Sequence, residues 1–262
     1  MNNPGRSMGP NRVRVLAESY VYDAAFQNMA AVGSAYGARR IIAAVHAMLA
    51  VKAVLDVGCA RGTWLREWQA SGVGTVVGVD GDYVDRNKME IDPACFVVRD
   101  LAQPFRLDRE FDLAQSLEVA EHLPAARAAG FVADLVAHAP MVLFSAAPPG
   151  QGGEHHINEQ LGAYWQALFH QHGYVAIDCL RPLLARDARV PAWYRYNLIL
   201  YARRDTLDSV APFARQFQLR DGEMITDPSP TLYKLRKRII QALPQSACDR
   251  LAQWNARRFP QG

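Results

Sequence analysis

Short apolar runs rich in β-branched residues alternate with segments of helical periodicity, and this alternation constrains the fold more than any other feature of the sequence. Seven such runs predict β-strands at residues 51–58, 74–80, 95–101, 111–117, 141–146, 173–180 and 197–203. Helical patterns separate most of them, whereas the last two have no helical signal between them. The sequence therefore predicts an α/β fold, with helices around a doubly wound, mostly parallel seven-stranded sheet that carries an antiparallel hairpin at one edge.

The chain is predicted to consist of three parts. Residues 1–50 hold a polar tail and an Ala-rich helical segment, which Gly33 and Gly37 are expected to break into two cap helices. Residues 51–204 form the sheet domain, and residues 205–262 form a basic helical extension. Further helices are predicted at 62–70, 124–138, 159–171, 232–243 and 247–259, the third of them with Asn158 as its N-cap.

Composition excludes several classes of protein. Half of the 262 residues are hydrophobic and 21% are charged, which is enough apolar material for a core and too much for a wholly disordered chain. No run approaches the roughly 18 apolar residues of a membrane-spanning helix, and the N-terminus lacks the apolar core of a secretory signal. The four cysteines form no metal-ligand pattern, so free thiols in a reducing cytoplasm are expected.

The net charge of +3 comes from one end of the chain. Residues 228–262 hold seven basic side chains and one acidic side chain, a net charge of +6, so the other 227 residues carry −3. Such a segment is typical of a solvated tail, and a surface for an anionic carrier, a membrane or a protein partner is the alternative. A charge of this size gives no clear indication of nucleic-acid binding.

The turn after the first predicted strand is the most specific local signal. Gly58 and Gly62 allow the backbone to approach a ligand closely, and the helix that follows offers free N–H groups. Asp56 stands at the end of the strand, where its carboxylate repels a pyrophosphate and attracts an ammonium group. Because the turn also lacks the G-x-G-x-x-G pattern, an aminoacyl cofactor is favoured over a dinucleotide.

The segment VLDVGCARG resembles the first motif of class I S-adenosylmethionine-dependent methyltransferases, D/E-x-G-x-G-x-G, with Ala60 in place of the central glycine. The run SLEVAEH at 116–122 is similar to the segment that follows the fourth strand in that superfamily. The resemblance covers roughly residues 40–203 and implies a Rossmann-like fold, S-adenosylmethionine as cofactor and S-adenosylhomocysteine as product. In these enzymes the acid matching Asp80 accepts the ribose hydroxyls, and the acid matching Asp100 meets the adenine. The implied cofactor-binding residues are Asp56, Gly58, Ala60, Gly62, Asp80, Asp100, Leu101, Ser116 and Leu117.

Three histidines are candidates for the acceptor side. His122 follows the fourth predicted strand, while His155 and His156 lie in the Gly/Pro-rich loop after the fifth. Histidine is the usual side chain for removing a hydroxyl proton near neutral pH, so these three are the predicted catalytic residues. The predicted substrate-binding residues are Glu121, Asn158, Trp165, Tyr194 and Arg195. No metal is predicted, because no second cluster completes an oxygen-rich site.

The predicted function is a cytoplasmic enzyme that transfers a methyl group to a small-molecule acceptor, with histidine assisting deprotonation of a hydroxyl. The string G-G-x-H-H-x-N-E-Q resembles bacterial methyltransferases that modify sugars and natural products. N-methylation of a small molecule is one alternative. Methylation of RNA or protein recruited by the basic extension is another, and a dinucleotide-dependent oxidoreductase is a third, disfavoured by Asp56. The chain is also a candidate for homodimer formation.

Overall fold

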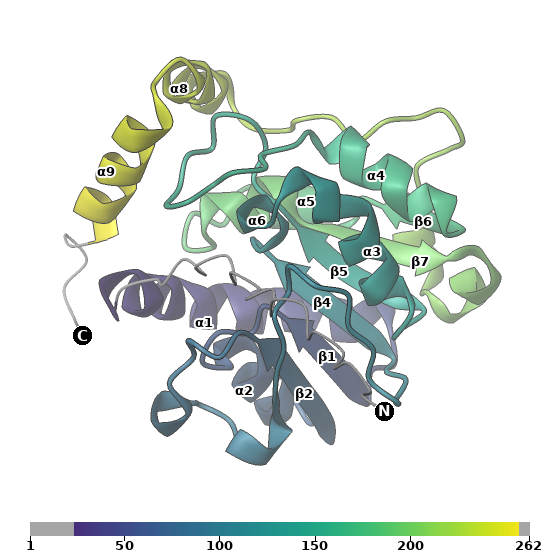
Figure 1. Ribbon diagram of the computed structural model, residues 1–262. Helices are drawn as coiled ribbons and strands as arrows, with labels where there is room; N and C mark the ends of the chain where they lie inside the picture. Colours follow the sequence, from purple (N-terminus) through teal and green to yellow (C-terminus); the bar gives the residue numbers. More distant parts are fainter. Residues whose placement is uncertain (1–23, 257–262) are drawn as a thin grey trace, which may run out of the picture.

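A seven-stranded sheet forms the centre of the molecule in the computed structural model, which describes the backbone of residues 24–256 and the side chains of residues 35–254 (Figure 1). The strand order is β3-β2-β1-β4-β5-β7-β6. All neighbouring pairs are parallel except those of β7, which runs antiparallel to both β5 and β6. The strands are β1 (Ala53–Val57), β2 (Thr75–Asp80), β3 (Phe96–Val98), β4 (Leu113–Leu117), β5 (Met141–Ser145), β6 (Tyr174–Ile177) and β7 (Ile199–Arg203). The predicted fold class is confirmed.

Two apolar layers sandwich the sheet. One layer contains α1 (Ala24–Met48), α2 (Thr63–Ala70), α5 (Leu180–Leu184) and α6 (Ala192–Asn197), and its core includes Ile41, Trp68 and Leu184. The other contains α3 (Ala128–Val136) and α4 (Gly162–Gln171), with Phe131 and Phe169 fully buried. Because helices cover both faces, the central strands read as continuous apolar runs rather than alternating ones.

The strand order places a topological switch point between β1 and β4. After β1 the chain continues to β2 and β3 on one side of the switch point. After β4 it continues to β5 on the other side. Loops that follow the carboxyl ends of β1 and β4 therefore diverge and leave a crevice, which is where open α/β sheets bind ligands.

The structure corrects three details of the helix predictions. The helix α1 continues through Gly33 and Gly37 instead of breaking there. At Gly37 a Cβ atom would lie 3.3 Å from Cδ of Pro191, so this glycine serves a close contact. The short helices α5 and α6 lie between β6 and β7, where no helix was predicted. The helix α4 begins at Gly162, with Leu161 at the cap position, so Asn158 is not its N-cap.

Within its described residues, up to Ala256, the basic extension packs against the rest of the chain and does not form the solvated tail that its charge suggested. Residues 257–262 lie outside the described part of the chain. It contains a 3-10 segment (Arg204–Ser209), α7 (Pro212–Arg215), α8 (Thr231–Gln241) and α9 (Gln245–Ala256). Arg236 on α8 donates to the Gln151 carbonyl at 3.0 Å, and Asp249 on α9 accepts from the His155 backbone N–H at 3.0 Å. Both contacts reach the loop that follows β5, which rises from the sheet toward α8 (Figure 1).

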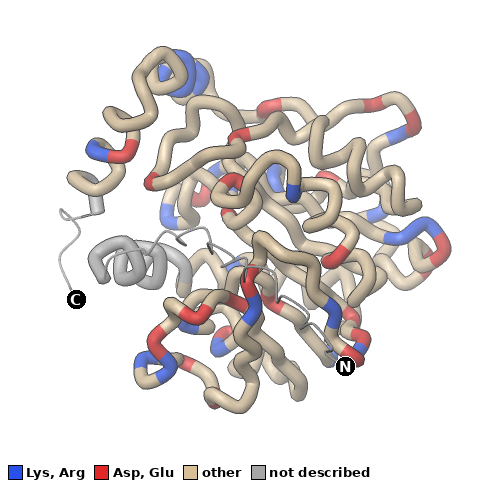
Figure 2. Tube along the Cα trace, viewed as in Figure 1, with Lys and Arg blue, Asp and Glu red and all other residues tan. Residues whose placement is uncertain are grey.

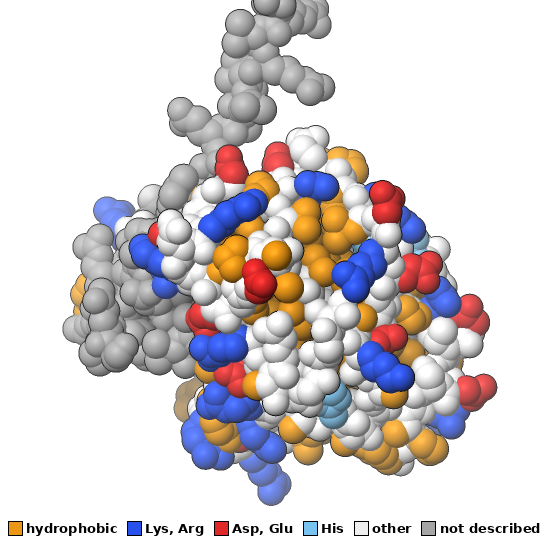
Figure 3. Space-filling view, turned by 90° about the horizontal axis from the view of Figure 1, so that it is seen from below, with side chains coloured by type: hydrophobic (Ala, Val, Ile, Leu, Met, Phe, Trp, Pro, Cys, Tyr) orange, Lys and Arg blue, Asp and Glu red, His pale blue; other side chains and the backbone are white. Residues whose placement is uncertain are grey.

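Charge is distributed unevenly over the fold. Basic side chains gather on α8 (Figure 2). Figure 3 shows that acidic and basic side chains are interspersed around apolar ones on the face seen from below. Within residues 24–256, no helix combines the length and the apolar character needed to cross a membrane.

Candidate active site

Three residues of the turn after β1 adopt the left-handed backbone conformation that favours glycine. They are Gly58 (φ 86°), Ala60 (φ 47°) and Gly62 (φ 84°). A Cβ atom at Gly58 would lie 2.3 Å from Cγ2 of Val119, so the turn after β1 touches the turn after β4. Because Ala60 carries a methyl side chain, its left-handed backbone conformation costs about 1–2 kcal/mol. The superfamily motif has glycine at that position, and the positive φ gives the physical reason.

Asp80 connects this turn to the end of β2. Its carboxylate accepts from the backbone N–H of Ala60 at 2.7 Å and of Gly81 at 2.7 Å, and also from the hydroxyl of Tyr83. The side chain is 3% exposed, and burial raises its pKa against the lowering effect of these three donors. The predicted ribose acceptor therefore lies beside the glycine turn, at the carboxyl edge of the sheet.

Asp56 is a second buried carboxylate at this edge. The pKa of Asp56 is raised to about 7, mainly by burial. The hydrogen bond with the Gln115 amide lowers the pKa, and the charge of Asp80 raises it. A buried carboxylate next to a glycine turn suits the ammonium group of an aminoacyl cofactor. The Ser116 hydroxyl at the end of β4 is also fully buried and lacks a hydrogen-bond partner among the described residues. These residues fit S-adenosylmethionine.

The other predicted cofactor residues are placed less closely. Asp100 is exposed after β3 and accepts from the Ala102 N–H at 2.9 Å, while Leu101 is buried. Leu117 is half-buried at the last position of β4. The two predicted adenine-side residues are therefore a buried apolar side chain and an exposed acid.

We expect cofactor affinity to depend on pH through Asp56. If the ionised carboxylate meets the cofactor ammonium, binding below pH 7 must first remove its proton. Affinity for S-adenosylhomocysteine should therefore fall about tenfold between pH 8 and pH 6, with roughly one proton released per site at pH 6. Isothermal titration in two buffers of different ionisation enthalpy measures both quantities. The Asp56→Asn variant should lose this dependence, and a wild-type affinity that is flat over the range would contradict the assignment.

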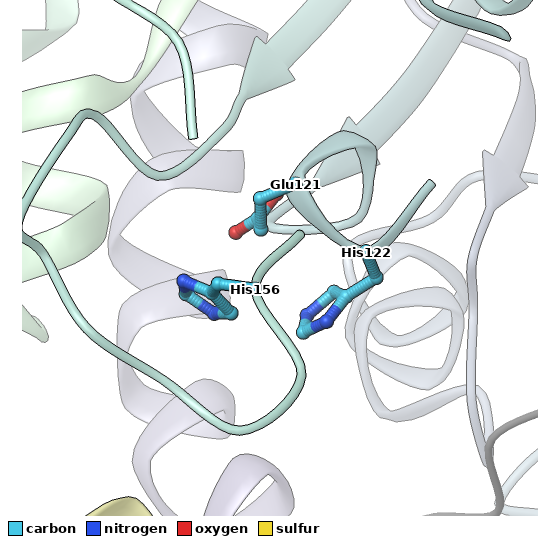
Figure 4. Close-up of side chains that lie close together, drawn as sticks. All are labelled: Glu121, His122 and His156. Atoms are coloured by element: carbon cyan, nitrogen blue, oxygen red, sulfur yellow. The ribbon is translucent and has the colours of Figure 1, made fainter. Parts of the chain in front are cut away.

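On the acceptor side, Glu121, His122 and His156 lie together. One potential ligand atom from each lies within 4.8 Å of the others, and Figure 4 shows the three side chains facing a common space. Glu121 and His122 belong to the 3-10 turn Ala120–His122 after β4, and His156 comes from the loop after β5. The two imidazole centroids are 4.8 Å apart with the rings nearly perpendicular. The structure thus brings together two of the three predicted catalytic histidines.

The environment fixes the charge of two members of this cluster. Burial, together with the nearby His156, lowers the pKa of His122 to about 3, so this ring is neutral at physiological pH. Burial also holds the pKa of Glu121 well above its usual range, and the adjacent Glu118 raises it further, against the backbone N–H groups of Glu121 and Ala147. No hydrogen bond of normal geometry reaches either carboxyl oxygen of Glu121 from the described residues.

Glu159 orients His156 and was not among the predicted site residues. Its Oε1 lies 2.9 Å from Nδ1 of His156, and its two oxygens also accept from the N–H groups of Gly150 and Gly152. Burial raises the pKa of Glu159, but the hydrogen bonds from His156 and the two glycines outweigh burial and lower it overall. In the sequence, this contact is indicated only by the position of Glu159 three residues after His156.

Glu118, Gln151 and Asn197 form a second polar group that sequence reasoning missed. The Gln151 amide donates to Glu118 at 2.6 Å, and Asn197 donates to Glu118 at 3.2 Å and to Gln151 at 2.7 Å. Glu118 has a φ of 57°, a strained conformation for a side-chain-bearing residue and one that clusters at functional sites. The three residues come from the turn after β4, the loop after β5 and α6, so no sequence spacing marks them.

The structure corrects the predicted substrate roles of two aromatic residues. Trp165 is 2% exposed and packs against Phe144 in the core. Tyr194 is 5% exposed, stacks edge-on against Trp64 and accepts from its indole N–H at 3.3 Å. Both are core residues because their helices turn these positions toward the sheet.

Of the remaining predicted residues, Asn158 and His155 contact the loops that carry the cluster. Asn158 is buried and donates to the Ala120 carbonyl at 3.3 Å, which ties the two loops together. The His155 carbonyl contacts Nδ1 of His122 at 3.3 Å, so His155 meets the cluster through its backbone. Arg195 lies over the Tyr196 ring, and its guanidinium donates to the Ala185 carbonyl at 3.4 Å.

Comparisons with known proteins identify a family for this chain and solved structures that resemble it. Residues 34–180 match a family described as "Methyltransferase domain". The sugar N-methyltransferase KedS8 from Streptoalloteichus sp. has a similar structure, with a TM-score of 0.52 and 16% identity over 77% of this chain and 100% of that one. Magnesium protoporphyrin IX methyltransferase from Synechocystis, solved with bound S-adenosylhomocysteine, gives a TM-score of 0.46 and 20% identity over 66% of this chain and 84% of that one. No curated protein matches by sequence.

The family match covers more than half of the chain, including the glycine turn, both buried acids and the histidine cluster. This chain therefore belongs to the methyltransferase-domain family. Its fold is that of the class I enzymes, and its cofactor is S-adenosylmethionine.

Proposed function

We propose that this enzyme methylates a hydroxyl group of a small-molecule acceptor and that His122 and His156 assist removal of the hydroxyl proton. The observation that carries the proposal is the cluster of Glu121, His122 and His156 at the carboxyl edge of the sheet, beside the turns after β1 and β4. The cofactor supplies an electrophilic methyl group, so the protein must align the acceptor and manage its proton.

The cluster has a task with a hydroxyl acceptor that it lacks with an amine. A hydroxyl is a poor nucleophile until its proton is removed, whereas an amine above its pKa presents a lone pair directly. A neutral His122 and a His156 ring oriented by Glu159 suit the first task. The likeness to a sugar N-methyltransferase concerns the fold, so N-methylation is the alternative that the experiment must separate.

Contacts of the basic extension disfavour a macromolecular substrate recruited by α8. Arg236 is hydrogen-bonded to the acceptor-side loop, and Lys237 is 7% exposed and paired with Asp227. Two of the basic side chains on this helix are therefore committed to contacts within the chain.

The proposal is tested with a panel of sugar alcohols and their matched amino sugars. Methyl transfer from labelled S-adenosylmethionine is followed by mass spectrometry, which locates the methyl group on oxygen or nitrogen. We expect O-methylated products, and His156→Gln should lower their rate of formation by about 100-fold without changing affinity for S-adenosylhomocysteine. Products methylated on nitrogen alone, at equal rates for the wild type and the His156→Gln variant, would overturn the proposal.

A further inference from the structure

We propose that Glu121, His122 and His156 bind a divalent first-row metal ion that positions the acceptor hydroxyl. This inference rests on the proposed function for its role: His122 and His156 would assist deprotonation as ligands of the ion, because their Nε2 lone pairs would bind the ion instead of the hydroxyl proton. The ion site itself rests on the geometry of the three side chains. It departs from the prediction of no metal, because the three residues belong to two separate loops that converge only in the folded chain.

The donor set is close to a metal-binding arrangement. Donor atoms bound to one ion at about 2.1 Å stand about 3–4 Å from one another, and the three donors here lie within 4.8 Å. Glu121 contributes a fully buried carboxylate that lacks a hydrogen bond of normal geometry within the described residues, and Figure 4 shows it directed toward the histidines. A buried acid of this kind keeps its proton unless a cation or a metal ion stabilises the ionised form.

Both imidazoles are oriented as in metal sites. Nδ1 of His156 faces a carboxylate oxygen of Glu159 at 2.9 Å, and Nδ1 of His122 faces the His155 carbonyl at 3.3 Å. Each of these oxygens only accepts hydrogen bonds, so each ring places its proton on Nδ1 and keeps the lone pair on Nε2. Metal-binding histidines are held by this kind of outer contact, to a carboxylate or a backbone carbonyl.

A fourth group lies beside the three donors. The carboxyl of the half-buried Glu118 interacts with that of the fully buried Glu121. An ion of charge +2 between them would remove their repulsion. Glu118 directly follows β4 and has a positive φ, a strained conformation for a residue with a side chain.

The donor types indicate which ions fit. Two imidazoles and a carboxylate suit Mn²⁺, Fe²⁺ or Zn²⁺ better than Mg²⁺ or Ca²⁺, which prefer oxygen ligands. Three protein ligands also leave positions open, as in catalytic rather than structural sites. An ion there would act as a Lewis acid toward an acceptor hydroxyl, lowering the pKa of that hydroxyl and fixing its orientation.

The test uses the intact chain, stripped with EDTA and titrated with Mn²⁺ while electron paramagnetic resonance follows the signal of the free ion. We expect one bound Mn²⁺ per chain and spin-echo modulation from coordinated ¹⁴N of histidine. Glu121→Gln and His156→Gln should each weaken Mn²⁺ binding at least tenfold. Gly153→Ala should weaken it as well without removing a ligand, because a Cβ atom there would lie 2.1 Å from Nε2 of His156.

His170→Gln is the matched control, since this exposed histidine on α4 lies outside the cluster, and its Mn²⁺ affinity should equal that of the wild type. A wild-type chain that binds S-adenosylhomocysteine but shows no Mn²⁺ binding, or bound Mn²⁺ without ¹⁴N modulation, would overturn the metal site and leave the methyl-transfer proposal standing. Mn²⁺ binding with histidine modulation in a chain that forms only N-methylated products would support the site and overturn the proposed function instead.

Discussion

Replacing Asp80 with Asn is expected to weaken binding of S-adenosylhomocysteine by between about 100- and 10,000-fold. Two ribose hydroxyls donating to one carboxylate form two charge-assisted hydrogen bonds, each worth roughly 1.5–3 kcal/mol. The substitution keeps the size of the side chain but replaces one acceptor oxygen with an NH₂ donor. This donor would face the backbone N–H of Ala60 or of Gly81, which is also a donor. Isothermal titration with the purified variant measures the loss.

Tyr83→Phe is the matched control for this prediction. The Tyr83 hydroxyl donates to Asp80, so its removal alters the same carboxylate without reducing its accepting capacity. We expect the affinity of this variant to stay within about threefold of the wild type. Thermal denaturation of both variants separates a lost ligand contact from a distorted glycine turn. An Asp80→Asn variant that binds as tightly as Tyr83→Phe would show that this acid does not hold the ribose.

Replacing Asp134 with Ala should lower the free energy of unfolding by about 3–5 kcal/mol. Asp134 and Arg127 form a buried ion pair, with side chains 11% and 7% exposed. Without its partner, the Arg127 guanidinium stays buried through its hydrogen bonds to the carbonyls of Leu101 and Gln103. For a chain of this size the melting temperature should fall by about 10 °C, as measured by circular dichroism or calorimetry.

Asp208→Ala provides the comparison for a surface pair. Asp208 is fully exposed and pairs with Arg215, and such pairs contribute less than about 1 kcal/mol. The double variant Arg127→Leu, Asp134→Leu should regain part of the stability lost in Asp134→Ala, because no charge is then left unpaired. Equal losses in Asp134→Ala and Asp208→Ala would contradict this account of the buried pair.

The sheet and the cofactor side follow from local sequence patterns, which explains why they were predictable. A buried strand is a short apolar run, and the turn after β1 needs residues that tolerate a positive φ, so Gly58 and Gly62 mark it directly. The continuous α1 was not predictable, because the contact that Gly37 serves comes from Pro191, far along the chain. Local propensity at that position opposed the helix, and packing outweighed it.

The acceptor side depends on contacts between distant segments. His122 and His156 were singled out by their places after β4 and β5, but their convergence with Glu121 depends on how two loops fold over one another. The partnership of Gln151 with Asn197 joins residues 46 positions apart. Trp165 was among the predicted substrate-binding residues, whereas its position on α4 places it in the core.

The contact between α8 and the loop after β5 has a consequence for diversification of the enzyme. A Cβ atom at Gly150 would lie 2.0 Å from the Lys237 carbonyl oxygen, and one at Gly152 would lie 2.9 Å from Ile240. The loop after β5 and α8 are therefore closely packed, and a larger side chain on either one requires the other to shift. A chimera that carries the loop after β5 from a relative should fold only when it also carries the C-terminal helices of that relative. We therefore expect the loop and the helices to change together when the range of acceptors changes.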